Sequence, residues 1–280
     1  MEVQYRIGVA VWKEAFPSFD KGTGPCLAGR RSDRRVPASG TESFVRLGGR
    51  AMKLNRILID VDTQRDFLAA NASLPVANAA TAIPALRRIM SWARVTRVPI
   101  ISTLDTHRDN EIRQGVPLHC LEGTPGQRKL DFTLMRHRRL VETDTTLALP
   151  LDLLDTYHQV IFRKRGRDFF ANPKADRLLT DLDAAEIIVC GVGLECCVRS
   201  LVLGLMARHK RVALIPEACG TWNSVDGELA ARLMEAKGVR MLSVDELVAS
   251  NGVSDNGRHR QPGPNAQAPK NNGRVAQPKR

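Results

Sequence analysis

Short apolar runs alternate with longer amphipathic stretches through the middle of this 280-residue chain, and this alternation limits the possible folds most strongly. Ile57-Leu58-Ile59 and Ile187-Ile188-Val189 are apolar at every position, which is typical of strands that helices cover on both faces. The pattern predicts a doubly wound α/β domain: three αβα layers around a mostly parallel six-stranded sheet. The predicted strands are 56–60, 98–103, 159–163, 186–190, 211–215 and 239–242. The predicted helices lie near 78–97, 173–182, 195–209 and 226–237.

The two ends of the chain differ in composition from this middle. Residues 1–51 lack periodicity, and residues 251–280 are rich in Asn, Gly, Pro, Gln, Lys and Arg. Such segments bury too little apolar surface to offset chain entropy. We therefore predict a disordered N-terminal extension (1–51), a folded domain (52–250) and a disordered basic tail (251–280). Met52 is an alternative start of the natural protein; a mitochondrial transit peptide fits less well, because residues 1–51 include five acidic side chains.

The net charge of +12 is concentrated in these ends. Lys and Arg outnumber Asp and Glu by nine to five in residues 1–51 and by six to one in residues 250–280, against 27 to 24 between them. A domain that binds nucleic-acid phosphates carries its excess of Lys and Arg on the surface of the folded domain. Solvated ends are thus the favoured interpretation, and we do not expect nucleic acid as a partner, although the tails could contact it weakly.

The sequence has no feature of a membrane or secreted protein. No apolar run reaches the roughly 18 residues of a membrane-spanning helix. Trp12, Lys13 and Glu14 interrupt the one short apolar stretch near the N-terminus, so no signal peptide is recognised. The six cysteines are too few for a disulfide scaffold in a chain of this length. We therefore expect reduced thiols and a cytoplasmic protein without a membrane partner.

Reactive and charged side chains follow four of the predicted strands. In an open α/β sheet, ligands bind beyond the carboxyl ends of the strands, where such side chains meet. The residues concerned, in chain order, are Asp62, Asp105, His107, Lys164, Cys196 and Cys197. Each alone is weak evidence for a site, but their convergence on one edge predicts a catalytic one.

A cysteine nucleophile is the first hypothesis for this edge. Cys196 and Cys197 start the predicted helix after the fourth strand, and a helix N-terminus and a lysine such as Lys164 both stabilise a thiolate. Asp62 would accept the thiol proton. Successive helical residues point about 100° apart, so we expect only one of the two cysteines to face the cleft. The alternatives are a buried, inert cysteine and a strained vicinal disulfide.

The same turn allows a second interpretation, as a dinucleotide-binding loop. Gly191-Val192-Gly193 opens a helix after a strand, as in a Gly-x-Gly-x-x-Gly fingerprint. Cys196 occupies the third glycine position, where close packing of helix on sheet needs a small residue. Glu217 would then be the candidate ribose ligand. This interpretation is the weaker of the two.

Residues 105–158 fit the strand–helix alternation poorly and contain a possible metal site. The segment is polar and broken by prolines, and we expect a long irregular excursion. Its basic run 136–139 is interpreted as a solvated face, whereas one or two side chains of the run 163–167 are expected to face the cleft. Asp105, His107 and His119, with Glu111 between them, are ligand types that suit Zn²⁺, Fe²⁺ or Mn²⁺. The alternative is ordinary polar loop residues.

Taken together, these motifs resemble the isochorismatase-like cysteine hydrolases, and within them the nicotinamidases, over about residues 55–248. Residues 62–67 match the family's Asp-x-Gln-x-Asp-Phe, and residues 105–107 match its Asp-x-His. Residues 117–126 resemble Pro-x-His-Cys-x-x-Gly-Thr-Pro-Gly, and residues 191–199 resemble Gly-Val-x-Thr-Asp-x-Cys-Val-x. The departures are Val116 in place of an aromatic residue and Leu194-Glu195 in place of Thr-Asp.

The resemblance implies an isochorismatase-like hydrolase fold, which is Rossmann-like, and a role for each site residue. It places the catalytic residues at Asp62, Lys164 and Cys197. It places the oxyanion hole at the backbone N–H groups of Gly193 and Cys197, with a cis peptide at Val192–Gly193. The implied metal ligands are Asp105, His107 and His119, with Glu111 as a substitute for a further ligand. The implied substrate-pocket residues are Phe67, Val116 and Cys196.

The activity implied by the resemblance is hydrolysis of a small carboxamide through a thioester. In a nicotinamidase, nicotinamide and water give nicotinate and ammonia, a step of pyridine nucleotide salvage, and the metal binds the pyridine nitrogen. Two alternatives stay open: a hydrolase of another small amide or ureido compound, and a non-catalytic binding protein on the same fold. A homo-oligomer is possible, and its size is not predicted.

Overall fold

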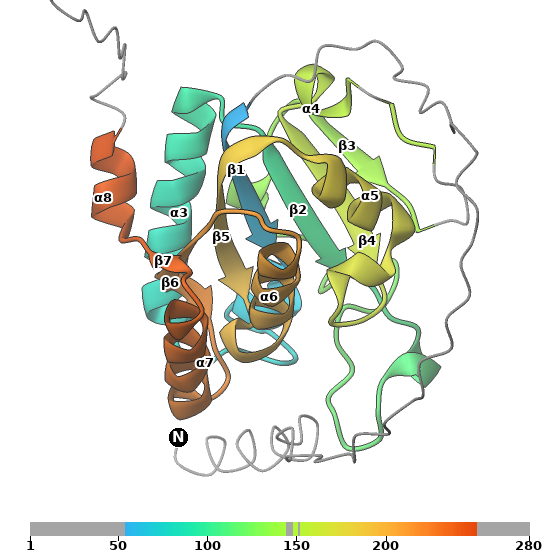
Figure 1. Ribbon diagram of the computed structural model, residues 1–280. Helices are drawn as coiled ribbons and strands as arrows, with labels where there is room; N and C mark the ends of the chain where they lie inside the picture. The colour runs from blue at the N-terminus through green and yellow to red at the C-terminus, as the bar shows by residue number, and fades with distance from the viewer. Residues whose placement is uncertain (1–53, 144–147, 151, 251–280) are drawn as a thin grey trace, which may run out of the picture.

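A seven-stranded sheet runs through the computed structural model, which describes residues 54–143, 148–150 and 152–250 (Figure 1). The strand order is β3-β4-β2-β1-β5-β6-β7, and every neighbouring pair is parallel. The strands are β1 (Leu54–Val61), β2 (Ile100–Asp105), β3 (Arg138–Val141), β4 (Gln159–Lys164), β5 (Ala184–Val192), β6 (Val212–Gly220) and β7 (Arg240–Met241). The two predicted disordered segments, 1–51 and 251–280, lie outside the described residues.

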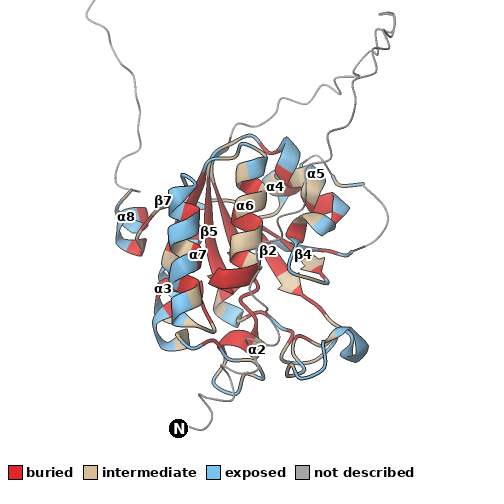
Figure 2. Cartoon of the chain, turned by 60° about the horizontal axis from the view of Figure 1, so that its bottom comes forward, coloured by how far each residue is buried: buried red, intermediate tan, exposed pale blue. Residues whose placement is uncertain are grey.

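Helices cover both faces of the sheet. Side chains of α3 (Ala79–Thr96) and α8 (Val244–Ala249) pack on one face in a single apolar cluster with Leu58 and Ile188. The other face is covered by α4 (Leu153–Thr156), α5 (Pro173–Asp181), α6 (Arg199–Ala207) and α7 (Ser224–Ala236). The short helix α2 (Arg65–Leu68) follows β1. Figure 2 shows the strands as the most deeply buried layer, and the three-layer αβα prediction is confirmed.

Local signals in the sequence fix several of the helix ends. Pro173 occupies the first turn of α5, and the Asn172 side chain accepts hydrogen bonds from the backbone N–H groups of Lys174 (3.0 Å) and Ala175 (3.3 Å). These contacts satisfy N–H groups that have no partner within the helix. Asn223 caps α7 in the same way. The short polar residue before each apolar stretch therefore marks where the helix begins.

The structure differs from the predicted elements in several ways, and helices α2, α4 and α8 were not predicted. The sheet has seven strands rather than six, because β3 adds to the edge beside β4 within the segment expected to be irregular. The strand predicted at 211–215 continues to Gly220 as β6. The helix predicted near 195–209 is divided into a π-helical turn, Leu194–Val198, and α6.

The topology brings four strand ends to one place. From β1 the chain moves to β2 and β4 on one side and then to β5 on the other, which creates a switch point at β1. Gly191, near the end of β5, has φ +124°, and a Cβ there would lie 2.0 Å from the Val61 carbonyl oxygen. Only glycine allows β1 and β5 to approach this closely. The crevice beyond these strands is where ligands bind in such sheets.

Within the described ranges, no helix combines the length and the apolar character that crossing a membrane requires.

Candidate active site

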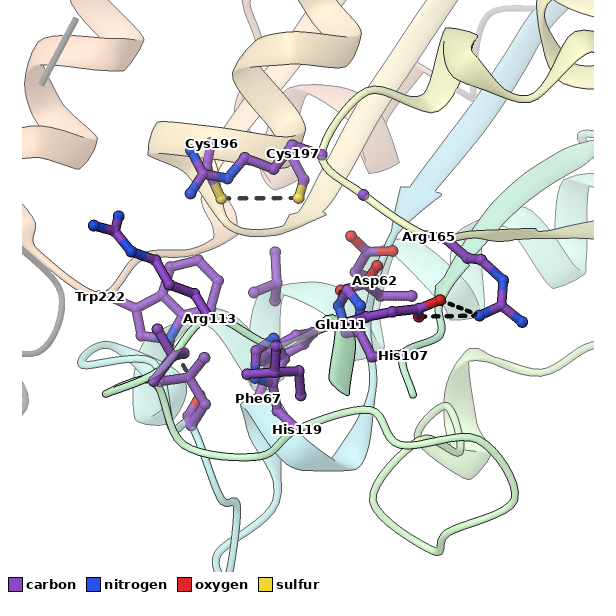
Figure 3. Close-up of a pocket in the computed structure, with 17 residues that line it drawn as sticks. Asp62, Phe67, His107, Glu111, Arg113, His119, Arg165, Cys196, Cys197 and Trp222 are labelled. Carbon is purple, nitrogen blue, oxygen red and sulfur yellow. Dashed lines mark hydrogen bonds and ion pairs between the residues drawn. The ribbon is translucent and has the colours of Figure 1, made fainter. Parts of the chain in front are cut away.

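A cavity of about 250 Å³ opens at the carboxyl ends of the central strands (Figure 3). Most of the residues singled out in the sequence line it. They are Asp62, Phe67, Asp105, His107, Glu111, Val116, His119, Cys196 and Cys197. Lys164 contacts three of these residues: Asp62, Asp105 and Cys197. Gly193 is the residue immediately before the turn that carries both cysteines. The structure therefore gathers the predicted residues in one place.

Lys164 is the centre of a buried cluster of charges. It is the last residue of β4 and is 3% exposed. Its Nζ lies 2.8 Å from Asp62 Oδ2 and 3.0 Å from Asp105 Oδ1, and it donates to the Gly166 carbonyl at 2.9 Å. Removing an ammonium from water is costly unless carboxylates and hydrogen bonds replace the water, and here they do. Asp105 contributes its other oxygen to a contact with His107 Nε2 at 2.9 Å.

Asp62 follows β1 in a left-handed backbone conformation, with φ +45°. The Thr103 hydroxyl donates to Asp62 Oδ1 at 2.6 Å, and the Asp62 backbone N–H donates to the same hydroxyl oxygen at 3.0 Å. The Asp62 carboxylate is thus held between Thr103 on one side and Lys164 on the other.

The two carboxyl groups beside Lys164 differ in pKa. Burial raises the pKa of Asp62, and Lys164 offsets this only in part while Asp105 adds to it. Burial would also raise the pKa of Asp105, but Lys164 and His107 outweigh it and hold that pKa at about 2. The pKa of Lys164 is raised well above its ordinary value, because the two carboxylates outweigh its burial. Of the two carboxyl groups, Asp62 is therefore the one that gains a proton more readily.

The cysteines lie on the π-helical turn Leu194–Val198, which begins after a cis peptide at Val192–Gly193. Cys197 Sγ lies 3.7 Å from Lys164 Nζ and 3.8 Å from Cys196 Sγ. Both cysteines line the cavity, so the expectation that only one would face it is wrong. In a π-helical turn the backbone bond spans five residues, as from Val198 N–H to Gly193 O (3.0 Å), so successive side chains diverge less than in an α-helix.

Cys197 is a thiol in this arrangement rather than a preformed thiolate. Its pKa is raised well above the ordinary value by the hydrogen bond with Cys196 and by burial, and these effects outweigh Lys164. This differs from the expectation that the helix end and Lys164 would favour the thiolate. All five cysteines of the described residues are free, so no vicinal disulfide is present in this part of the chain.

Asp105, His107 and His119 form a group that could hold a metal ion, with ligand atoms within 4.8 Å of one another. His119 Nδ1 lies 2.7 Å from the Pro117 carbonyl oxygen and must carry the proton there, so Nε2 keeps its lone pair for a metal. Burial also lowers the pKa of His119, which favours the neutral ligand form. The donor set of one carboxylate and two imidazoles therefore fits a divalent transition metal.

The structure does not bring Glu111 into this metal-binding group. Both of its carboxylate oxygens face Arg165 Nη1, at 2.8 and 3.0 Å, and one of them also accepts from the Arg108 backbone N–H at 2.8 Å. Arg165 lines the cavity, which matches the expectation for the run 163–167. The sequence predicted Glu111 as a metal ligand because it lies between the other ligands along the chain. In the structure, its carboxylate is instead paired with Arg165, which belongs to another loop.

Trp222 is the main cavity residue that sequence reasoning missed. Its ring lies edge-on to Phe67, with 5.5 Å between ring centroids, and a Cβ on Gly193 would lie 2.1 Å from it. The Trp222 backbone N–H donates to Glu195 Oε1 at 2.7 Å, which joins the residue to the cysteine turn. The only signal in the sequence was a tryptophan soon after an apolar strand, and that strand was predicted to end too early.

Glu217, the ribose ligand of the dinucleotide interpretation, lies away from this cavity. Its carboxylate accepts a hydrogen bond from the Val244 backbone N–H at the start of α8. That interpretation is not supported.

Comparison with known proteins identifies the family of this chain and solved structures that share its fold. The sequence model of the Isochorismatase domain family matches residues 56–246. No curated protein matches the chain. Among solved structures, the pyrazinamidase of Pyrococcus horikoshii in complex with zinc is 24% identical, with a TM-score of 0.53, and the match covers 68% of this chain and 99% of that one.

Two further structures have the same fold. PnC1 from L. infantum, solved in complex with nicotinate, is 19% identical with a TM-score of 0.54, and the match covers 69% of this chain and 95% of that one. An isochorismatase-like hydrolase from Alkaliphilus metalliredigens is also 19% identical with a TM-score of 0.55, and the match covers 71% and 97%. At such identities the likeness establishes the fold.

Proposed function

The chain belongs to the isochorismatase family, and from this premise we propose that it hydrolyses a small carboxamide through a thioester on Cys197. The observation that carries the proposal is one buried ammonium that contacts both a carboxylate and a thiol beside a cavity. Lys164 Nζ lies 2.8 Å from Asp62 Oδ2 and 3.7 Å from Cys197 Sγ. A base, a nucleophile and a fixed positive charge are the parts that such acyl transfer needs.

The first step is transfer of the thiol proton. Asp62 has a raised pKa and is the acceptor, and Lys164 stabilises the thiolate as the proton leaves. The Cys197 sulfur then attacks the carboxamide carbon, and the carbonyl π electrons move to the oxygen. Because the resting thiol is neutral, the nucleophile forms only when substrate and base are in place.

The next steps use backbone donors and the same carboxyl group. The N–H groups of Gly193 and Cys197 are the proposed donors to the tetrahedral oxyanion, and one such donor is worth about 3–4 kcal/mol in the transition state. Asp62 returns its proton to the departing nitrogen, which leaves as ammonia. Asp62 then takes a proton from water, the hydroxide attacks the thioester, and the acid is released as Cys197 regains its proton.

We also propose that Asp105, His107 and His119 hold Zn²⁺, Fe²⁺ or Mn²⁺. When bound, the metal would act as a Lewis acid toward a ring nitrogen of the substrate and so orient the ring. His119 is prepared for this role because Pro117 holds its Nδ1–H. The zinc named for the Pyrococcus horikoshii pyrazinamidase supports the metal class, and the protein's own choice among the three ions is open to measurement.

Nicotinamide, or a similar planar pyridine carboxamide, is the substrate that we propose. Phe67 and Trp222 present aromatic rings to a cavity of about 250 Å³, a size for a small ring compound. Arg113 also lines the cavity, and its guanidinium group favours a second candidate: an amide or ureido compound that carries a carboxylate.

Ammonia release from a panel of amides tests the proposal. The panel is nicotinamide, pyrazinamide, benzamide and a ureido acid, assayed with the wild type, Cys197→Ala and Cys219→Ala, whose thiol is buried and does not line the cavity. We expect nicotinamide to react faster than benzamide, and Cys197→Ala alone to be inactive. Faster release from the ureido acid selects the second candidate. Turnover by Cys197→Ala would refute the thioester.

A further inference from the structure

Two thiols, rather than one, face the cavity, and the proposed chemistry uses only Cys197. Cys196 Sγ lies 3.8 Å from Cys197 Sγ, and both residues line the cavity. Figure 3 shows the two sulfur atoms on the same side of the turn, pointing toward the cavity. Cys196 is a buried residue, 8% exposed. The proposed hydrolysis gives its thiol no role, although it lies beside the nucleophile.

The spacing of the sulfurs matches that of two thiolates on one metal ion. Zn–S bonds of about 2.3 Å at a tetrahedral angle place the two sulfurs about 3.8 Å apart. The observed 3.8 Å therefore fits Zn²⁺ as the turn stands, and the larger Cd²⁺ requires a slightly wider separation of the sulfurs. A disulfide, by contrast, would require the sulfurs to approach to about 2.05 Å.

The charges around the pair also favour a cation once the thiols are deprotonated. Lys164 lies 3.7 Å from Cys197 Sγ and opposes a positive ion. The carboxylates of Asp62 and Asp105, at 2.8 and 3.0 Å, already more than offset its charge. Two thiolates added to this cluster leave a net negative site, to which a divalent cation is attracted.

We propose that Cys196 and Cys197 form a second metal site, for a soft thiophilic divalent cation such as Cd²⁺ or excess Zn²⁺, separate from the Asp105–His107–His119 group. Each S–H bond breaks, each sulfur gives an electron pair to the ion, and two protons pass to solvent; nothing is oxidised. Soft cations prefer thiolate ligands, whereas the carboxylate–imidazole group suits harder ions. Occupation removes the nucleophilic electron pair of Cys197, so the ion inhibits; this consequence alone rests on the proposed function.

Cadmium binding to the full chain tests the site directly. The freshly reduced protein is loaded with one equivalent of Zn²⁺ and titrated with Cd²⁺, and the ultraviolet thiolate-to-cadmium charge-transfer band is recorded. We expect the band to saturate at one Cd²⁺ per chain. Cys196→Ser and Cys197→Ser should each weaken binding by about 100-fold or more, since even outer-shell changes cost 10–100-fold. Cys219→Ala is the matched control, and both it and His119→Ala should keep the band.

The contrary outcomes are equally distinct. A band that survives in Cys196→Ser, or that disappears in Cys219→Ala or His119→Ala, would place the cadmium elsewhere and overturn the proposal. Inhibition is compared with each variant's own uninhibited rate, and Cys196→Ser should need about 100-fold more Cd²⁺ for half-inhibition. If the wild type hydrolyses no amide of the panel, the proposed function fails, while the charge-transfer band still decides whether the site exists.

Discussion

Two buried lysines of this domain make nearly the same ion pair, but only one of them also contacts a thiol beside the cavity. Lys129 and Lys164 are each 3% exposed, and each pairs with an aspartate at the end of β1: Lys129 with Asp60 at 2.9 Å, Lys164 with Asp62 at 2.8 Å. Lys164 also contacts a thiol beside the cavity. Lys129 contacts the carbonyl of Thr103 at 3.2 Å and does not line the cavity.

A buried charge pair therefore does not by itself mark a catalytic site. Asp60 accepts a hydrogen bond from Ser102 and an ion pair from Lys129, within the sheet. The two pairs meet at Thr103, whose carbonyl contacts Lys129 and whose hydroxyl contacts Asp62. We interpret the Lys129 pair as a structural pair that stabilises the sheet below the site. The Lys164 pair is interpreted as catalytic, because only Lys164 contacts a candidate nucleophile beside the cavity.

The largest expected effect is on activity, and it concerns Cys197, the thiol that Lys164 contacts. Cys197→Ala removes the nucleophile and should lower kcat by on the order of 10⁴-fold or more, while the unfolding midpoint in urea stays within error of the wild type. Cys219→Ala should keep its activity. Steady-state ammonia release and urea titration on the same preparations provide both readouts. Residual turnover within tenfold of the wild type would show that another group attacks.

The Lys129 pair should show the opposite pattern. Lys129→Met leaves Asp60 buried without its partner and should cost about 3–5 kcal/mol of unfolding free energy, measured by urea titration. The folded fraction should keep kcat within about tenfold, or 1.4 kcal/mol. The double variant Asp60→Leu/Lys129→Met should recover most of the stability. If Lys129→Met loses kcat without losing stability, the distinction between the two pairs is wrong.

A smaller effect is expected from His119→Ala, which tests the metal group beside Lys164. Metal content should fall, and KM for nicotinamide should rise about tenfold, or 1.4 kcal/mol of binding, because the ring loses its anchor. Benzamide lacks the ring nitrogen, and its KM is the matched control that should stay unchanged. An equal rise for both amides would mean that His119 shapes the pocket rather than holding a metal.

The smallest expected effect is on thermal stability, and it distinguishes Asp62 from Asp105, the two carboxyl groups that contact Lys164. The Asp105 pKa is about 2 in the fold, so its stabilisation is present above its ordinary pKa of 3.8 and is lost as pH falls toward 2. The Asp62 pKa is raised, so its contribution is present below its ordinary pKa and is lost as pH rises through the raised value.

Asp62→Asn should therefore raise Tm at pH 7 by about 2–4 °C, although it removes the base and activity. Asp105→Asn should lower Tm at pH 7 and flatten the loss of stability toward pH 2. Thermal unfolding between pH 2 and pH 7 checks both. A lower Tm at pH 7 for Asp62→Asn would show that the ion pair with Lys164 outweighs the burial of Asp62.

Much of the fold and site could be predicted from the sequence, for a physical reason. Strands buried on both faces must be apolar throughout, so runs such as Ile57-Leu58-Ile59 are conspicuous. Parallel strands also end at one edge, so Asp62, Lys164 and Cys197 could be brought together without knowing any distance. The predicted residues that line the cavity follow from those two facts and from the motif spacing.

The parts that could not be predicted depend on context outside the local pattern. Strand β3 is a polar edge strand, with three of its four residues exposed, so the run 136–139 had no apolar signature. Trp222 enters the cavity because β6 continues to Gly220, beyond the apolar run that defined the predicted strand. Cys196 joins Cys197 because the turn is π-helical, and a hydrophobic period does not report how many residues a single turn contains.

In the proposed reaction, Cys197 carries the acyl group. In the most direct measurement, the wild type is mixed with excess nicotinamide, quenched in acid within one turnover, digested, and sequenced by mass spectrometry across residues 194–199. We expect a nicotinoyl thioester on Cys197 that forms and decays at rates compatible with ammonia release. An adduct on Cys196, or ammonia release by the wild type with no adduct on either cysteine at any quench time, would contradict it.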